Sequence, residues 1–228
     1  MQPNLFYLSG PHGSGKTTLE QLLKEADTRI LVPELISNAP KFDIEPVYRQ
    51  RMKLCERAIE NYEYLKLARE HPERLVLGNR CLYDVLAYHW VYYAKGWISQ
   101  EEFNFHNRYA QELFLEENAS PNCIVLNPSY PVVQRHLEER WKSKPKKWGE
   151  DDERYTQLAC EVYERLEGRE NVFYIDHEIN LQDSPEIPRI LRWMKQRGAQ
   201  KEQVHGEAVP LHYPLTPANP TLTTPSYL

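Results

Sequence analysis

The chain has 228 residues, which is enough for one well-packed core, so a single domain is expected. Its 28 Lys and Arg residues are outnumbered by 33 Asp and Glu residues, which gives a net charge of −5. This balance excludes a general binder of nucleic acid or of anionic membranes, because no excess positive field exists to attract phosphate groups.

The first predicted element is a short buried strand at 5–9, which a glycine-rich turn connects to a helix at 17–26. The turn, GPHGSGKT, fits the phosphate-binding pattern G-x-x-x-x-G-K-[ST]. Its glycines let backbone N–H groups surround phosphates, and the helix N-terminus adds positive charge. Lys16 is expected to reach the β- and γ-phosphates and Thr17 to ligate Mg²⁺, so the pattern predicts binding of ATP or GTP with magnesium. The residues expected at the nucleotide are Gly10, His12, Gly13, Ser14, Gly15, Lys16, Thr17 and Thr18.

The first strand follows Met1 so closely that no signal peptide is expected. The longest apolar run, VLAYHWVYYA, is too short to span a bilayer. The four cysteines form no C-x-x-C pair, and three of them lie in apolar sequence, which favours buried free thiols in a reducing compartment. A cytoplasmic protein without a membrane partner is therefore expected.

Short β-rich runs alternate with helical stretches along the rest of the chain. This alternation is typical of a parallel sheet with helices on both faces. On the second helix, Glu56, Glu60 and Glu63 among basic partners are expected to mark the exposed side. The predicted strands are 5–9, 29–32, 74–78, 123–127 and 172–175. The predicted helices are 17–26, 47–70, 81–95, 100–118, 131–141, 151–167 and 185–198.

Polar residues directly after the strands are further candidates, since ligands of parallel sheets bind beyond the carboxyl ends of the strands. Glu34 follows the second strand, Asn127 the fourth, and Asp176, expected near the adenine, the fifth. Arg80, after the third strand, would lie next to the phosphate loop, where its fork of donors can bridge donor and acceptor phosphates. The alternative is an arginine at a helix start that binds no ligand.

From about residue 199 the composition changes, and five of the 17 prolines fall in the segment VHGEAVPLHYPLTPANPTLTTPSYL. Such a segment cannot continue a helix and buries little apolar surface. Residues 1–198 are therefore predicted to form the folded domain, and residues 199–228 an extended tail that lies on the domain or on a partner.

The sequence from Arg80 through Asp84 to Ala87-Tyr88-His89 resembles the D-R-Y-x-x-S-S-x-A-Y-Q segment of thymidylate kinases. Glu34, in VPELI, stands where those enzymes have R-E-P and where deoxynucleoside kinases have a catalytic glutamate. Arg57, on the long helix before Arg80, resembles the arginine of a (D/N)-R pair that contacts the substrate nucleotide. The resemblance covers about residues 4–198.

A lid is also implied, because Leu126-Asn127-Pro128 followed by Arg135 and Arg140 resembles the segment that leads into the lid of these kinases. The following stretch, WKSKPKKWGED, clusters six cations together with the two arginines. A solvated basic loop is the alternative. Phosphoryl transfer, however, needs cations over the γ-phosphate, so the resemblance implies a lid at about 141–150. Arg140 would be its arginine finger, braced by Arg135, while Trp141 and Trp148 would latch the lid or simply pack.

The resemblance implies an α/β fold of the P-loop NTPase type, a five-stranded parallel sheet flanked by helices with a small helical lid. It implies transfer of the γ-phosphoryl group of ATP–Mg²⁺ to a nucleoside monophosphate, foremost a pyrimidine deoxynucleotide. It also implies a homodimer through the helices at 81–118. The expected catalytic residues are Lys16, Arg80, Arg140 and Glu34. The expected acceptor-binding residues are Glu34, Arg57, Arg80, Asp84 and Tyr88.

Three positions depart from thymidylate kinases. Asn79 stands where they have an acid beside magnesium, Asn127 replaces another aspartate, and Lys53 replaces the aromatic side chain that stacks on thymine. A neutral amide cannot balance the charge of Mg²⁺ or act as a base, so the base preference and the acceptor stay open. One alternative is a nucleoside, nicotinamide riboside or polynucleotide 5′-hydroxyl kinase with Glu34 as base. Another is a P-loop regulator that binds ATP without kinase activity.

Overall fold

A computed structural model of the chain describes residues 4–33, 44–113, 121–179 and 184–200. Five parallel strands form one sheet in the order β2-β3-β1-β4-β5. The first strand lies at the centre, and its residues are all buried. The strands are β1 (Leu5–Ser9), β2 (Ile30–Leu31), β3 (Leu75–Asn79), β4 (Asn122–Leu126) and β5 (Val172–Ile175).

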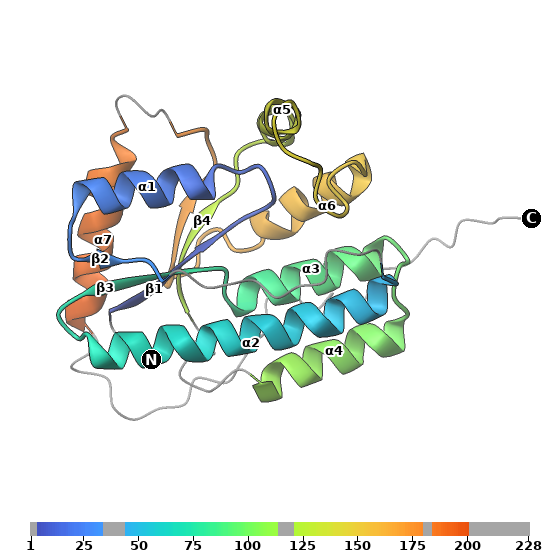
Figure 1. Cartoon of the computed structure of the whole chain (residues 1–228), viewed down its shortest axis with the longest axis horizontal. Coiled ribbons are helices and arrows are strands. Elements are labelled where there is room, and N and C mark those ends of the chain that lie inside the picture. The colour runs from blue at the N-terminus through green and yellow to red at the C-terminus, as the bar shows by residue number, and fades with distance from the viewer. Residues whose placement is uncertain (1–3, 34–43, 114–120, 180–183, 201–228) are drawn as a thin grey trace, which may run out of the picture.

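Helices cover both faces of this sheet, as Figure 1 shows. They are α1 (Lys16–Ala26), α2 (Pro46–Glu70), α3 (Leu82–Ala94), α4 (Gln100–Leu113), α5 (Tyr130–Trp141), α6 (Glu153–Glu164) and α7 (Glu186–Gln200). Each strand and helix predicted from the sequence is present, with ends shifted by no more than a few residues. Residues 114–118 of the predicted fourth helix and residues 201–228 of the predicted tail lie outside the described part of the chain.

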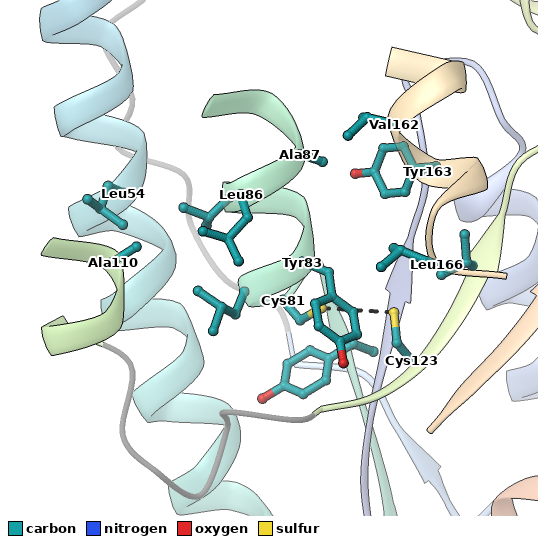
Figure 2. Close-up of a cluster of buried hydrophobic side chains, with 14 of the residues drawn as sticks. Leu54, Cys81, Tyr83, Leu86, Ala87, Ala110, Cys123, Val162, Tyr163 and Leu166 are labelled. Carbon is teal, nitrogen blue, oxygen red and sulfur yellow. Dashed lines mark hydrogen bonds between the residues drawn. The ribbon is translucent and has the colours of Figure 1, made fainter. Parts of the chain in front are cut away.

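The two faces of the sheet pack against different helices because side chains alternate along β1. Phe6 and Leu8 join a core with α1 and α7. Leu5 and Tyr7 join a second core built with α2, α3 and α6. Part of this second core surrounds two buried thiols, Cys81 and Cys123, whose Sγ atoms lie 3.9 Å apart (Figure 2).

The predicted state of the cysteines is confirmed. All four are free thiols, and Cys81, Cys123 and Cys160 are buried whereas Cys55 is exposed. Burial raises the pKa of Cys160 to about 12, so this thiol stays protonated and packs as a small apolar side chain. In the described part of the chain, no helix combines the length and the apolar character that crossing a membrane requires.

The prediction for the exposed side of α2 is wrong. Glu56, Glu60 and Glu63 are half-buried, and the first two pair with Lys53 and Arg57 on the same helix. The most exposed large apolar side chains of the described residues include four of α2, with Ile59 66% exposed. Lys53 and Arg57, the partners of these glutamates, line a large pocket, described below.

Two buried histidines, His89 of α3 and His106 of α4, lie where these helices pack, with ring centroids 5.2 Å apart. Burial, and then the neighbouring His106, lower the pKa of His89 to about 3. A histidine whose folded pKa lies below its unfolded value of 6.5 stabilises the fold above that value. The stabilisation is lost as the pH falls from 6.5 toward 3.

We therefore expect the free energy of unfolding to decrease by about 2 kcal/mol on lowering the pH from 6.5 to 5 because of His89 alone. Urea unfolding of the wild type and of His89→Gln at both pH values measures this contribution of His89 to the free energy of unfolding. The variant cannot titrate, so its decrease should be smaller by that amount. An equal decrease in both proteins would show that His89 is not the group responsible.

Candidate active site

One large open pocket of about 2340 Å³ lies beyond the carboxyl ends of β1 and β3. The phosphate loop, α2, α3 and the segment between α5 and α6 all contribute side chains to it. The sequence-predicted residues that line it are His12, Gly13, Ser14, Gly15, Lys16, Thr17, Thr18, Arg57, Arg80, Asp84, Tyr88 and Arg140.

The loop between β1 and α1 has the backbone that phosphate binding requires. Gly10, Gly13 and Gly15 have φ values of 137°, 79° and 96°, which other residues rarely adopt. A Cβ atom on Gly10 would lie 2.1 Å from the carbonyl oxygen of Leu126, and one on Gly13 would lie 2.8 Å from Leu137. The loop therefore cannot carry side chains at these positions, and its N–H groups are left to face a ligand.

Lys16 is folded back onto this loop. Its Nζ donates to the carbonyl oxygens of Gly10 and Pro11, at 2.9 and 2.6 Å, and to the Ser14 hydroxyl at 3.2 Å. Burial, and then the charge of Arg80, lower the pKa of Lys16 well below its usual range. A bound anion would reverse this effect, because a phosphate next to the amine favours the charged form.

Arg80 lies beside the loop, as predicted. Its Nη1 donates to Asp84 at 2.9 Å and approaches the Gly10 carbonyl at 3.4 Å, and its guanidinium lies 5.1 Å from the centre of the Tyr88 ring. Among the described residues it is the one non-glycine residue with positive φ, at 73°. Such a backbone is costly and persists where surrounding contacts hold it, so Arg80 is fixed in place rather than free on the surface.

The contacts of Asp84 explain how Arg80 is held. The Asp84 carboxylate is 2% exposed and accepts hydrogen bonds from the hydroxyls of Ser9 and Tyr163, both at 2.5 Å, and from the Cys81 backbone at 2.9 Å. Sequence reasoning placed Asp84 at the acceptor but missed Ser9 and Tyr163. Asp84 therefore fixes the position of Arg80, while its predicted contact with the acceptor stays a prediction.

The acceptor side of the pocket is formed mainly by α2. Arg49, Lys53 and Arg57 line it, and Arg57 also donates to the Asn79 carbonyl at 3.3 Å. Sequence reasoning identified Arg57 but not Arg49. The buried Gln50, 4% exposed, also lines the pocket, and its Nε2 has no hydrogen-bond partner among the described residues. An unpaired buried amide is costly, which marks Gln50 as a group that a ligand would satisfy.

An aromatic wall, which sequence reasoning missed, lines another part of the same pocket. It consists of Tyr92, Trp97, Trp148 and Tyr155, all lining the pocket. Trp148 stacks on Tyr92 with ring centroids 5.0 Å apart, and Arg49 lies 4.9 Å from the Trp148 ring centre. Such surfaces hold planar rings, including nucleobases, by stacking. Trp148 belongs to the predicted lid segment, and its ring packs against α3 through Tyr92.

The lid segment connects α5 to α6 through turns and brings Arg140, Lys146 and Lys147 to the pocket. Arg140 pairs with Glu150, whose carboxylate also accepts hydrogen bonds from Trp141 at 3.3 Å and from the Lys147 backbone at 2.7 Å. Glu150 further pairs with His12 of the phosphate loop at 2.9 Å. The predicted lid segment is therefore tied to the loop through one carboxylate, whose role sequence reasoning missed.

The electrostatics of this contact are unusual. Burial alone would raise the pKa of Glu150, but hydrogen bonds from His12, the Lys147 backbone and Arg140 outweigh it and hold the pKa at about 2. Burial lowers the pKa of His12 to about 3, so its imidazole is neutral at physiological pH. A charged carboxylate thus lies against the phosphate loop, close to where a phosphate is expected.

Three predicted residues of the described chain lie elsewhere, namely Arg135, Asn127 and Asp176. Arg135 pairs with the exposed Glu178 at 2.5 Å instead of bracing Arg140. Asn127 donates to the Cys160 carbonyl and the Tyr174 hydroxyl, so it ties β4 to α6 and β5. Asn127 and Asp176 line a separate pocket of about 450 Å³ and not the large one. Glu34 lies outside the described residues.

The pocket has features suited to binding the phosphates of a nucleotide. Its loop glycines form a cradle that a Cβ atom would fill, and Thr17, in the first turn of α1, lines the same space. Among the described residues, no group of three or more His, Cys, Asp or Glu side chains is arranged to hold a metal ion. We propose Thr17, by its place in the phosphate-binding motif, as the residue that would ligate Mg²⁺.

Comparison with known proteins agrees with this geometry. The family model described as AAA domain (AAA_28) matches residues 5–168. No curated protein matches the sequence. The structure is similar to that of deoxyadenosine kinase from M. mycoides with bound dATP, with a TM-score of 0.63, 17% identity and coverage of 84% of this chain and 99% of that chain.

Two further structures of the same kinase match over the same shares of both chains at 17% identity. One holds the products dCMP and a flexible dCDP, with a TM-score of 0.61, and the other holds dCTP, with a TM-score of 0.59. At this identity the similarity shows the fold. The predicted P-loop fold with a five-stranded parallel sheet is confirmed.

Proposed function

The chain belongs to the AAA domain family, and on this basis we propose that it is a P-loop kinase that transfers the γ-phosphoryl group of ATP to a nucleoside monophosphate. One observation carries the proposal: the phosphate loop, the α2 cations and the lid cations all face a single pocket. Phosphoryl transfer depends on holding two reactants in line and on surrounding the transferred group with positive charge.

At the donor side, Lys16 and the loop N–H groups would bind the ATP phosphates. Thr17 would hold Mg²⁺, which neutralises phosphate charge when bound. Lys16 already lies at the loop, where it would exchange the Gly10 and Pro11 carbonyls for phosphate oxygens. The enzyme thus needs no large rearrangement of the loop to bind its donor.

The lid would contribute Arg140. In the present structure Arg140 is paired with Glu150, so the γ-phosphate must displace the Glu150 carboxylate from the Arg140 guanidinium. A phosphate carries more negative charge than a carboxylate and offers more acceptor oxygens, so the exchange is favourable. We propose that Arg140 stabilises the charge that develops on the transferred group.

Four cations support a phosphorylated acceptor: Arg49, Lys53 and Arg57 of α2 line the pocket, and Arg80 lines it next to the donor loop. Arg80 lies between the two sides, where its guanidinium could contact both phosphates. Gln50 and the aromatic wall would hold the base, by hydrogen bonds to its edge and by stacking on its faces.

A nucleoside acceptor is the second candidate, favoured by the structural likeness to deoxyadenosine kinase. A hydroxyl acceptor needs a general base, whereas a monophosphate is already an anion. Glu34 is the residue we would assign as that base.

Transfer of label from γ-labelled ATP to nucleosides, nucleoside monophosphates and a 5′-hydroxyl oligonucleotide separates these candidates. The proposal predicts label on a monophosphate. Label on a nucleoside or an oligonucleotide would replace the proposed acceptor and make Glu34 the base to test. Label released only as inorganic phosphate would contradict a kinase and support an ATP-hydrolysing regulator.

The substitution Gln50→Leu tests the proposed binding site of the nucleobase. The substitution removes the amide with little change of volume, so we expect the KM for the best acceptor of the panel to rise about 10–100-fold with little change in the KM for ATP. Gln21→Leu, on the exposed side of α1, is the matched control and should leave both constants unchanged. An equal rise of both KM values for Gln50→Leu would argue for a general defect of folding instead of base recognition.

A further inference from the structure

The exposed face of α2 carries an apolar row that nothing in the described part of the chain covers. It consists of Tyr48, Met52, Cys55, Ile59 and Tyr62, here called the α2 stripe. Its four large side chains are 55%, 43%, 66% and 56% exposed, in chain order. Steps of four and three residues alternate along the stripe, which is the spacing of the seam by which one helix packs against another.

The opposite face of the same helix lines the proposed active site through Gln50, Lys53 and Arg57, and further along the helix it buries Tyr64 and Leu65 in the core. The outer face of a surface helix is normally polar, so the α2 stripe is the unusual feature of this helix. A row of exposed apolar side chains on a domain of this size is typical of an interface between proteins.

The stripe is nearly symmetric about Cys55. Tyr48 and Tyr62 lie seven residues before and after it, and Met52 and Ile59 lie three before and four after. If a second copy packs antiparallel against α2 with the twofold axis at Cys55, each tyrosine faces the other tyrosine of the second copy. Met52 then lies opposite Ile59 of the second copy, with an offset of one residue along the helix. The surface is therefore complementary to itself, as a twofold interface requires.

Charges at the ends of the stripe select the antiparallel arrangement. Exposed Glu45 precedes it and exposed Lys66 follows it, each continuing the same spacing. An antiparallel pair places Glu45 of each copy beside Lys66 of the other, whereas a parallel pair places like charges together. Such flanking charges determine the orientation of paired helices.

We propose that two copies of this chain associate through an antiparallel pair of α2 helices centred on Cys55. This interface differs from the helices at 81–118 that the family resemblance implies. No large apolar side chain of α3 is exposed, and within the described part of α4 the most exposed one is Phe105, at 42%. The proposal does not depend on the kinase activity, because it rests on the surface of α2 alone.

Light scattering after size-exclusion chromatography tests the association. The full chain should elute with twice the 27.0 kDa of one copy, and Met52→Lys and Ile59→Glu should each have the mass of one copy. Since Met52 faces Ile59 of the second copy, mixing the two variants should restore the double mass through a Lys–Glu pair. Gln21→Lys, on exposed α1, should keep the double mass. A wild-type mass of one copy, or variants that remain dimeric, would contradict the proposal.

Disulfide formation tests the position of the proposed twofold axis at Cys55 and the antiparallel direction of the helices. Mild oxidation should link two wild-type chains through Cys55, the exposed thiol, and Cys55→Ser should abolish the link. In the Cys55→Ser background, Tyr48→Cys should not link to itself but should link to chains that carry Tyr62→Cys. A self-link of Tyr48→Cys would mean parallel pairing and would overturn the proposed arrangement. Circular dichroism of each variant verifies that it is folded.

Discussion

Replacement of Lys16 with alanine is expected to reduce phosphoryl transfer by about 10²–10³-fold, the usual effect of removing one preorganised charged donor from a transition state. The expectation follows from the position of the Lys16 amine, which lies within 3.2 Å of three oxygens of the phosphate loop. No other lysine of α1 can take its place, because Lys24 lies two turns further along the helix.

Initial rates of transfer at saturating ATP and acceptor measure this effect, and titration with a non-hydrolysable ATP analogue separates it from weaker binding. Lys24→Ala, an exposed lysine of the same helix, is the matched control and should retain the wild-type rate. If Lys16→Ala keeps a large share of the wild-type rate, the phosphate loop does not act as proposed.

Replacement of Arg80 with lysine should be nearly as damaging, with a loss of about 10²-fold in rate, although the charge is kept. The guanidinium contacts Asp84, the Gly10 carbonyl and the Tyr88 ring at once. An ammonium group is a single point of charge and cannot maintain this planar set of contacts or bridge two phosphates.

The control is Arg74→Lys at the opposite end of β3, where Arg74 donates to the backbone carbonyls of Thr28 and Arg29. That change should leave transfer unchanged. Rates and KM values for both substrates distinguish the roles of Arg80: a fall in kcat with both KM values constant indicates a contact made in the transition state. Normal transfer by Arg80→Lys would exclude Arg80 from the bridging position.

Much of this fold could be predicted from the sequence, because it follows local patterns. The apolar run before GPHGSGKT predicts β1, and the helical spacing of Leu19 and Leu23 predicts α1. The rule that ligands bind beyond the carboxyl ends of strands correctly places Arg80 at the loop. The same rule fails for Asn127 and Asp176, which lie at a separate pocket with side chains of α6 and β5.

The parts of the site that sequence reasoning missed depend on contacts between distant segments. The partners of Asp84 are Ser9 and Tyr163, separated from it by 75 and 79 residues. The aromatic wall joins Tyr92 of α3 to Trp148 of the lid, and nothing in the periodicity of either segment predicts that meeting. A partial signal for Glu150 was present, since it is the first acid after a run of lid lysines.

The α2 surface shows a different kind of error. Its pattern of Glu and Lys or Arg at helical spacing is typical of a solvated face, and those side chains do pair with each other. The basic members, Lys53 and Arg57, line the pocket, where a nucleotide site needs polar side chains. An apolar row on the outer face then remains, for which pairing with a second copy gives a physical reason.

The measurement that tests the central claim most directly is the affinity of a bisubstrate analogue, in which adenosine is joined through a chain of phosphates to the nucleoside of the preferred acceptor. If one pocket holds donor and acceptor together, titration calorimetry should show binding at least about 10²-fold tighter than that of a non-hydrolysable ATP analogue. Lys16→Ala and Arg80→Lys should each weaken it. Binding no tighter than that of the ATP analogue would contradict a shared site and thus the proposed kinase.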